Sequence, residues 1–266
     1  MKVGMPALVE YSALDELVEL CLKLKLDFIE LNMNLPYNFI ENVKPTELLK
    51  ISKDTNIEFT MHMPDEADLG AFYESVRKGY VELFSDTISW AEEAGVRLLN
   101  MHIIEGPNMT LPDRKVYIYE QYAGEFEDNF VNSISILSKK VLKGNIKLAI
   151  ENSSNFHHRF IQRILDKSIL YPNVGLTWDT GHDAVSGFTD RQYLQQHENE
   201  IIHMHLHDAI GTKDHQVLFE GSLDIEKLLA FAKQKKIRAL VEVKTAEALE
   251  KSINALENNL IIFNLN

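Results

Sequence analysis

Residues able to bind a metal ion follow several apolar runs of this 266-residue chain. In the stretch from Gly175 to His182, an apolar run leads directly into Asp179, Gly181 and His182. We expect Gly181 to ease the turn between the two polar side chains, because glycine accepts positive φ. A carboxylate and an imidazole at the end of a buried strand are costly to place without a partner. The stretch therefore indicates a site of chemistry.

The same pattern recurs along the chain, where hydrophobic runs end in His, Asp or Glu. These residues are Glu30, His62, His102, Glu151, Asp179, His182, His205 and Glu242. Because side chains alternate along a strand, Glu151 shares a face of its strand with Ala149. By the same alternation, His203, His205 and His207 lie together on one face of their own strand. Carboxylates that meet in a dry cavity repel one another and take up protons unless a cation lies among them. Carboxylate and imidazole together suit Zn, Mn, Fe or Co, so the sequence predicts a divalent-metal site.

These residues need a scaffold that brings distant strand ends together. The sequence predicts eight short strands, at Met1–Met5, Leu26–Leu31, Ile57–Met63, Val96–Ile104, Ile146–Glu151, Asn173–Trp178, Ile201–Leu206 and Ala239–Val243. Helices are expected at Tyr11–Lys25 with Ser12 as its cap, and at Pro45–Lys53, Gly70–Gly95, Arg114–Lys143, His157–Lys167, Ser186–Glu200, Leu223–Lys235 and Thr245–Asn258. Alternating strands and helices indicate a covered parallel sheet, and eight strands favour a closed barrel. The predicted fold is α/β, a single (β/α)8 TIM barrel domain over residues 1–266.

The composition restricts the partners and the compartment. The net charge is −13 and the pI about 5.2, so a broad basic surface for nucleic acid is not expected. Cys21 is the single cysteine and cannot form an internal disulfide, which agrees with a reducing compartment. We see neither a signal-peptide pattern nor an apolar stretch long enough to cross a membrane. The prediction is a soluble cytoplasmic protein, and the oligomeric state stays open.

Four motifs of the chain resemble the xylose isomerase-like TIM barrel superfamily, which holds sugar isomerases and epimerases together with endonuclease IV. These motifs are Ile150–Asn152, Trp178–His182, His203–Asp208 and Val241–Val243, and the resemblance extends over nearly the whole chain. It implies that a core metal is held by Glu151, Asp179, His205 and Glu242.

The endonuclease IV branch of this superfamily has extra histidines that complete a three-metal cluster. His62, His102, His182 and His215 match these histidines and are further candidate ligands. The branch also has an aspartate two residues before the last histidine, where this chain has Lys213. The resemblance therefore implies one to three divalent ions.

Three functions are compatible with these residues. The favoured one is a metal-dependent isomerase or epimerase of a sugar, sugar phosphate or polyol, in which Glu151 and Glu242 move a proton and His182 stabilises the enediolate oxygen. The alternative is a multi-zinc phosphodiesterase of the endonuclease IV type. The number of histidines favours it, whereas the net charge and the acidic loop Pro64–Asp68 oppose it. The third is a barrel without catalysis that binds a metal or a ligand.

Overall fold

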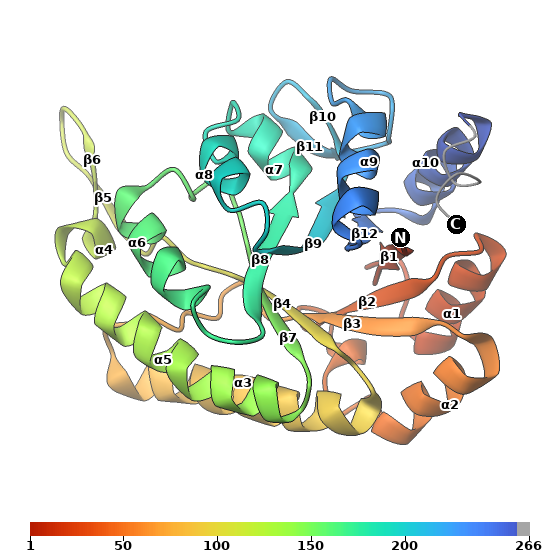
Figure 1. Ribbon diagram of the computed structural model, residues 1–266, viewed down its shortest axis with the longest axis horizontal. Helices are drawn as coiled ribbons and strands as arrows, with labels where there is room; N and C mark the ends of the chain where they lie inside the picture. Colours follow the sequence, from red (N-terminus) through yellow and green to blue (C-terminus); the bar gives the residue numbers. More distant parts are fainter. Residues whose placement is uncertain (260–266) are drawn as a thin grey trace.

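A computed structural model of the chain describes residues 1–259, and its centre is a closed barrel of parallel strands (Figure 1). Around the barrel the strands follow the order β1 (Val3–Pro6), β12 (Arg238–Val241), β9 (Ile201–Leu206), β8 (Val174–Asp179), β7 (Lys147–Glu151), β4 (Leu98–His102), β3 (Glu58–His62) and β2 (Phe28–Asn32). The predicted (β/α)8 barrel is thereby confirmed. The extent of one domain over residues 1–266 stays a prediction, because residues 260–266 lie outside the described part.

Helices surround the barrel (Figure 1). The longer ones are α1 (Leu14–Lys23), α2 (Pro45–Thr55), α3 (Glu74–Ala94), α5 (Ala123–Lys143), α6 (Arg159–Ser168), α9 (Ile225–Lys235) and α10 (Ala246–Asn258). The shorter ones are the 3₁₀ turn η1 (Pro36–Asn38) and the helices α4 (Ile118–Gln121), α7 (Thr180–Val185) and α8 (Arg191–Gln196). The helix predicted over residues 186–200 is therefore wrong for most of its length, since only the six residues of α8 are helical there.

Two hairpins lie in loops where the sequence pattern gave no strand. One pairs β5 (Asn108–Thr110) with β6 (Lys115–Tyr117), and the other pairs β10 (Asp208–Ile210) with β11 (Lys213–Gln216). The helix predicted from residue 114 to 143 is wrong at its start, because β6 and the separate turn α4 precede α5. The β5–β6 hairpin projects from the body of the molecule, at the left of Figure 1.

The starts of the helices show which capping signals act. Thr245 and Asp224 accept hydrogen bonds from the first turns of α10 and α9. Ser12 does not cap α1 as predicted. The carboxylate of Glu16 reaches back instead, and accepts the backbone N–H groups of Ser12 and Ala13. The acidic third residue thus forms the returning half of a capping box, and the serine side chain does not cap the first turn.

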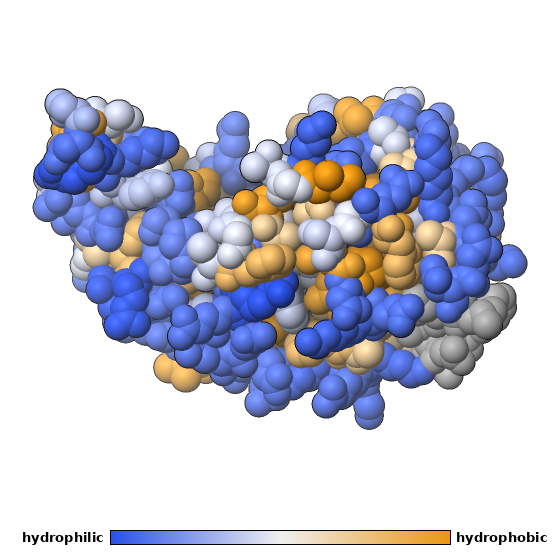
Figure 2. All heavy atoms as spheres, turned by 90° about the horizontal axis from the view of Figure 1, so that it is seen from above, coloured by the Kyte–Doolittle hydropathy of each residue, from blue (hydrophilic) through white to orange (hydrophobic). Residues whose placement is uncertain are grey.

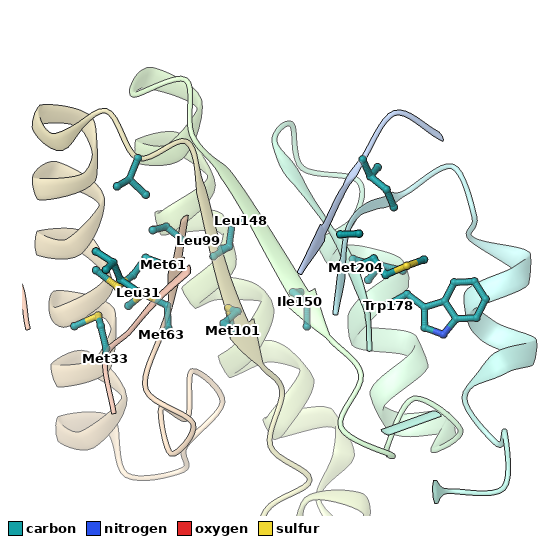
Figure 3. Packing of buried hydrophobic residues seen from close by; sticks show 14 of the residues in the cluster. Leu31, Met33, Met61, Met63, Leu99, Met101, Leu148, Ile150, Trp178 and Met204 are labelled. Atoms are coloured by element: carbon teal, nitrogen blue, oxygen red, sulfur yellow. The ribbon is translucent and has the colours of Figure 1, made fainter. Parts of the chain in front are cut away.

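Apolar side chains that point outward from the strands pack against the helices and form the main core (Figure 3). Methionines are frequent in this layer, and Met33, Met61, Met63, Met101 and Met204 are buried in it (Figure 3). Trp178 also points outward from β8, with 8% of its surface exposed. Outward apolar residues leave the alternate, inward positions of the same strands to polar side chains.

A large aromatic side chain lies inside the barrel toward the amino-terminal ends of the strands. Phe28 of β2 fills this end and is fully buried. Gly4 on the neighbouring strand makes room for it, because a Cβ atom there would lie 2.5 Å from the Phe28 ring. Above Phe28 the buried inward residues include Glu30, Thr60 and Asn100. The barrel interior above this aromatic ring is therefore filled largely by buried polar side chains.

The surface is largely hydrophilic. Seen from above, apolar side chains gather across the middle of the face and hydrophilic ones surround them (Figure 2). Among residues 1–259, each helix is too short or too polar to cross a lipid bilayer.

Candidate metal centre

The register of the barrel strands aligns the predicted ligands along one rim. Asp179 at the end of β8 pairs with His205 of β9, and His102 of β4 pairs with Glu151 of β7. Glu242 follows β12 directly, where its backbone N–H donates to the carbonyl of Leu206 at 3.0 Å. Because parallel strands end at the same edge, residues far apart in sequence become neighbours here.

Four predicted core ligands converge at this rim. Glu151, Asp179, His205 and Glu242 each offer a ligand atom, and these atoms all lie within 4.8 Å of one another. His205 Nδ1 is central among them, at 2.7 Å from Glu242, 3.2 Å from Glu151 and 3.9 Å from Asp179. The described residues therefore contain a group of three carboxylates and one imidazole that is able to hold a divalent ion.

The hydrogen bonding of this group fits a cation. Within the described chain, the buried atoms His205 Nδ1 and Glu242 Oε2 have no hydrogen-bond partner, although they approach each other closely. Unpaired polar atoms are expensive in a dry site, and a shared cation would satisfy both. Three oxygen donors with one nitrogen donor suit Zn, Mn, Fe or Co.

Two of the further candidate ligands flank Glu151. His62 Nε2 and His102 Nε2 lie 3.3 Å and 3.5 Å from the same oxygen, Glu151 Oε2. Asp65 follows β3 and approaches both rings, at 3.5 Å from His62 and 3.9 Å from His102. His62, Asp65 and His102 form a second group with metal-ligand spacing. Asp65 was not predicted as a ligand, although it belongs to the acidic loop noted in the sequence.

The other two candidate ligands lie on the Asp179 side. His182 Nδ1 is 3.5 Å from Asp179 Oδ2, and His215 Nε2 is 3.4 Å from Glu242 Oε1. Asp214 joins them, with Oδ2 at 3.7 Å from His182 and Oδ1 at 3.0 Å from His215. Asp214, the neighbour of Lys213, thus brings a carboxylate to this side of the centre.

His207 completes a third group with metal-ligand spacing, together with His182 and His215. Gly181 lies inside α7 and has no positive φ, so its predicted role in the turn is wrong. The turn is made instead by Asp179, whose Oδ1 accepts the backbone N–H of His182 at 2.6 Å and caps α7.

Glu30 lies beneath the four-residue group, where it is hydrogen-bonded to His203 and lies within ion-pair distance of His205. Its carboxylate accepts the Thr60 hydroxyl at 2.7 Å and lies 2.9 Å from His205 Nε2 and 3.1 Å from His203 Nε2. Burial would raise the pKa of Glu30, but His205 and His203 lower it far below its usual value. A carboxylate on Nε2 leaves Nδ1 of His205 directed at the metal group.

Three residues that support the ligands were not identified from the sequence. Asn100 donates to Glu151 Oε2 and is itself held by Thr177. Asn152 accepts the backbone N–H of Asp179 at 2.7 Å and donates to its carbonyl at 3.1 Å. Lys244 donates to Glu242 Oε1 at 2.7 Å. Asn152 belongs to one of the four motifs, which was the only signal in the sequence for any of the three. The contacts of Asn100 and Lys244 depend on strand register and left no such signal.

The charges of the centre are balanced by its histidines. Burial alone would raise the pKa of Glu151 and of Glu242, but the adjacent His205 lowers both well below the usual value. Burial would lower the pKa of His62, whereas its hydrogen bond to Glu151 raises it to about 9. Protonated imidazoles thus act as counter-ions, and a cation that binds here displaces protons.

A pocket of about 390 Å³ opens beside the centre. Its lining consists of Asp65, Glu66, His102, Ile103, Ile104, Glu105, Ser153 and Asn155. The lining contains three carboxylates and neither lysine nor arginine. Asn155 is 3% exposed, and its Oδ1 has no hydrogen-bond partner within the described residues. The pocket therefore offers several acceptors for hydroxyl groups and repels anions.

The curated relatives give no function. The uncharacterized protein MJ1311 of Methanocaldococcus jannaschii is 26% identical over 199 residues, which cover 70% of this chain and 64% of that protein. The chain therefore spans less than two thirds of the length of this relative.

Solved structures with the same fold are similar over their full length. A D-tagatose 3-epimerase-like protein has a TM-score of 0.80 at 24% identity, over 99% of this chain and 98% of the other. The IOLI protein with a binding zinc atom has a TM-score of 0.75 at 17% identity, over 98% of each chain. At these identities the likeness shows a common fold.

The family assignment rests on the sequence itself. The profile of the xylose isomerase-like TIM barrel matches residues 18–259, which include every ligand candidate described above. The chain therefore belongs to the xylose isomerase-like TIM barrel family.

Proposed function

We propose that the chain is a divalent-metal-dependent isomerase or epimerase of a sugar or a related hydroxy-carbonyl compound. The observation that carries the proposal is the convergence of Glu151, Asp179, His205 and Glu242 at the barrel rim. The fold shared with D-tagatose 3-epimerase-like and D-psicose 3-epimerase structures supports the same class of reaction.

The chemistry follows from the two glutamates of the group. A divalent cation held there would polarise the carbonyl and the neighbouring hydroxyl, which makes the intervening C–H more acidic. Glu151 or Glu242 removes this proton as a base, and the other glutamate returns a proton to the carbon from the opposite face. His182, which is partly buried beside Asp179, stabilises the developing enediolate oxygen. The steps invert one carbon of the substrate, and exchange of protons with solvent returns the two glutamates to their starting states.

The pocket beside the centre favours an uncharged substrate. Asp65, Glu66 and Glu105 on its wall would repel a phosphate group, whereas sugar hydroxyls can donate to them and to Asn155. Among the predicted substrates, we therefore place a sugar or polyol before a sugar phosphate.

Exchange of carbon-bound hydrogen with solvent tests the proposal. The protein loaded with Zn²⁺, Mn²⁺ or Co²⁺ is incubated in D₂O with ketohexoses, starting with D-tagatose and D-psicose, and deuterium at the carbon next to the carbonyl is followed by NMR. We expect exchange in the wild type and its loss in Glu151→Gln and Glu242→Gln. Glu93→Gln on the exposed face of α3 is the matched control. Full exchange in Glu242→Gln would contradict the mechanism.

A multi-zinc phosphodiesterase is the second candidate. The groups His62–Asp65–His102 and His182–His207–His215 favour it, since they provide ligands for further ions. The acidic pocket opposes it, because DNA backbones are bound through lysine and arginine. Metal analysis separates the two functions, since one ion per chain supports the isomerase and two or three support the phosphodiesterase. Nicking of a duplex with an abasic site would favour the second candidate.

A further inference from the structure

His207 is a fully buried histidine beside the metal centre that the mechanism does not use. Its Nδ1 accepts the backbone N–H of His215 at 2.7 Å, and its Nε2 lies 3.0 Å from Asp179 Oδ2. A nitrogen that accepts an N–H carries no proton of its own, so the ring proton is on Nε2. His207 therefore donates a hydrogen bond to the carboxylate oxygen of Asp179.

The position of the His207 ring is fixed from two sides. The His215 ring stacks on it at 4.1 Å between centroids, with 5° between the planes. On another side, a Cβ atom at Gly181 would lie 2.0 Å from Cε1 and 2.1 Å from Nδ1 of His207. The Gly181 backbone is helical, so its conformation would accept alanine. The ring, and not the backbone, is what requires glycine at this position.

We propose that His207 is a positioning residue that holds Asp179 as a metal ligand through a fixed Nε2–H tautomer, and that Gly181 is small in order to admit its ring. This inference rests on the proposed metal centre. It also limits the ligands available to a further ion, because both nitrogens of His207 are already engaged. A further ion between His182 and His215 would then not include His207 among its ligands. Removal of a residue that hydrogen-bonds to a metal ligand typically weakens metal affinity by roughly 10- to 100-fold.

The tautomer of His207 is measured directly in metal-free protein. Long-range ¹H–¹⁵N spectra of chelator-treated, ¹⁵N-histidine-labelled protein are expected to show the Nε2–H form for His207, identified by loss of its signals in His207→Gln. The Nδ1–H form would overturn the proposal. This readout requires neither bound metal nor activity, so it stays decisive even if the proposed function fails.

Zn²⁺ affinity then tests the positioning role. Competition with a chromophoric chelator is expected to show a roughly 10- to 100-fold weaker Kd for His207→Ala, and recovery of most of this loss in His207→Gln, whose amide N–H replaces the donor. His197→Ala, after the end of α8 and outside the centre, is the matched control. Unchanged Zn²⁺ affinity in His207→Ala would refute the positioning role, whereas absence of Zn²⁺ binding by the wild type would refute the metal centre.

A double-mutant cycle tests the contact between Gly181 and His207. Gly181→Ala alone is expected to weaken Zn²⁺ binding by about tenfold, because its methyl group displaces the ring and with it the donor to Asp179. In the His207→Ala background the same substitution is expected to have no further effect, since the space is already empty. Additive losses in the double variant would show that Gly181 acts independently of the ring.

Discussion

Replacement of Glu30 by glutamine tests the polar floor beneath the candidate metal centre. The carboxylate binds Thr60 at 2.7 Å and lies 3.1 Å from His203 and 2.9 Å from His205. Glutamine preserves the volume of the side chain. Its NH₂ group, however, can only donate, and it would face one of the donors that the carboxylate now accepts from. Breaking a buried ion pair costs about 3–5 kcal/mol, and we expect about 3 kcal/mol because the remaining oxygen keeps its bonds. For a chain of this size, the midpoint of thermal unfolding falls by about 6–12 °C.

The assay for Glu30→Gln combines unfolding with metal binding. Denaturant unfolding of the chelated protein gives the loss of stability, and a Zn²⁺ titration is expected to show roughly 10- to 100-fold weaker binding, because Nε2 of His205 loses its anionic partner. Glu19→Gln, exposed on α1, is the matched control for removal of a charge. A variant within about 1 kcal/mol of the wild type and with unchanged Zn²⁺ affinity would refute the reasoning.

Three further outcomes are expected. Burial would raise the pKa of Glu58, but Lys2 and Arg238 lower it, so its stabilising contribution is present above about pH 4.3 and is lost as the pH falls through the lowered pKa. Glu58→Gln should therefore flatten the fall of stability between pH 5 and 3 in urea unfolding, and an unchanged pH profile would contradict this. Asn152→Ala removes both hydrogen bonds to the Asp179 backbone and should destabilise by roughly 2–4 kcal/mol in the same assay. A loss below about 1 kcal/mol would mean that water replaces the amide. Zn²⁺ at one hundred times its Kd should stabilise the chelated protein by about 2.7 kcal/mol, and an absence of any shift would mean that the folded state does not bind it.

The barrel could be predicted because its strands are apolar on their outward face and end in polar residues. The hairpins β5–β6 and β10–β11 could not, since they contain charged residues such as Lys115 and Asp214 and carry no alternation of apolar side chains. The helix predicted over residues 186–200 illustrates a second limit. Polar residues with good helix propensity predict a helix, but packing on the barrel retains only residues 191–196.

The convergence of the candidate metal ligands could be predicted from residue type and from position at the strand ends. Their partners could not, because contacts across the barrel depend on register. Thr60 reaches Glu30 from the paired position on β3, and Asn100 reaches Glu151 from β4. Gly181 shows the same limit. Its small size was evident in the sequence, but the imidazole that requires it comes from His207, 26 positions further along the chain.

The methionines buried between the strands and the helices have a consequence for oxidative damage. Met109 on the projecting hairpin is 61% exposed, whereas Met61, Met63 and Met204 between barrel and helices are fully buried. Sulfoxide at Met109 places a polar group where water already reaches, but sulfoxide in the buried layer requires that the helices first separate from the strands. Mass spectrometry after brief peroxide exposure would therefore measure the oxidation of each methionine. The extent of oxidation at a buried methionine would report how often the helix that covers it separates from the barrel.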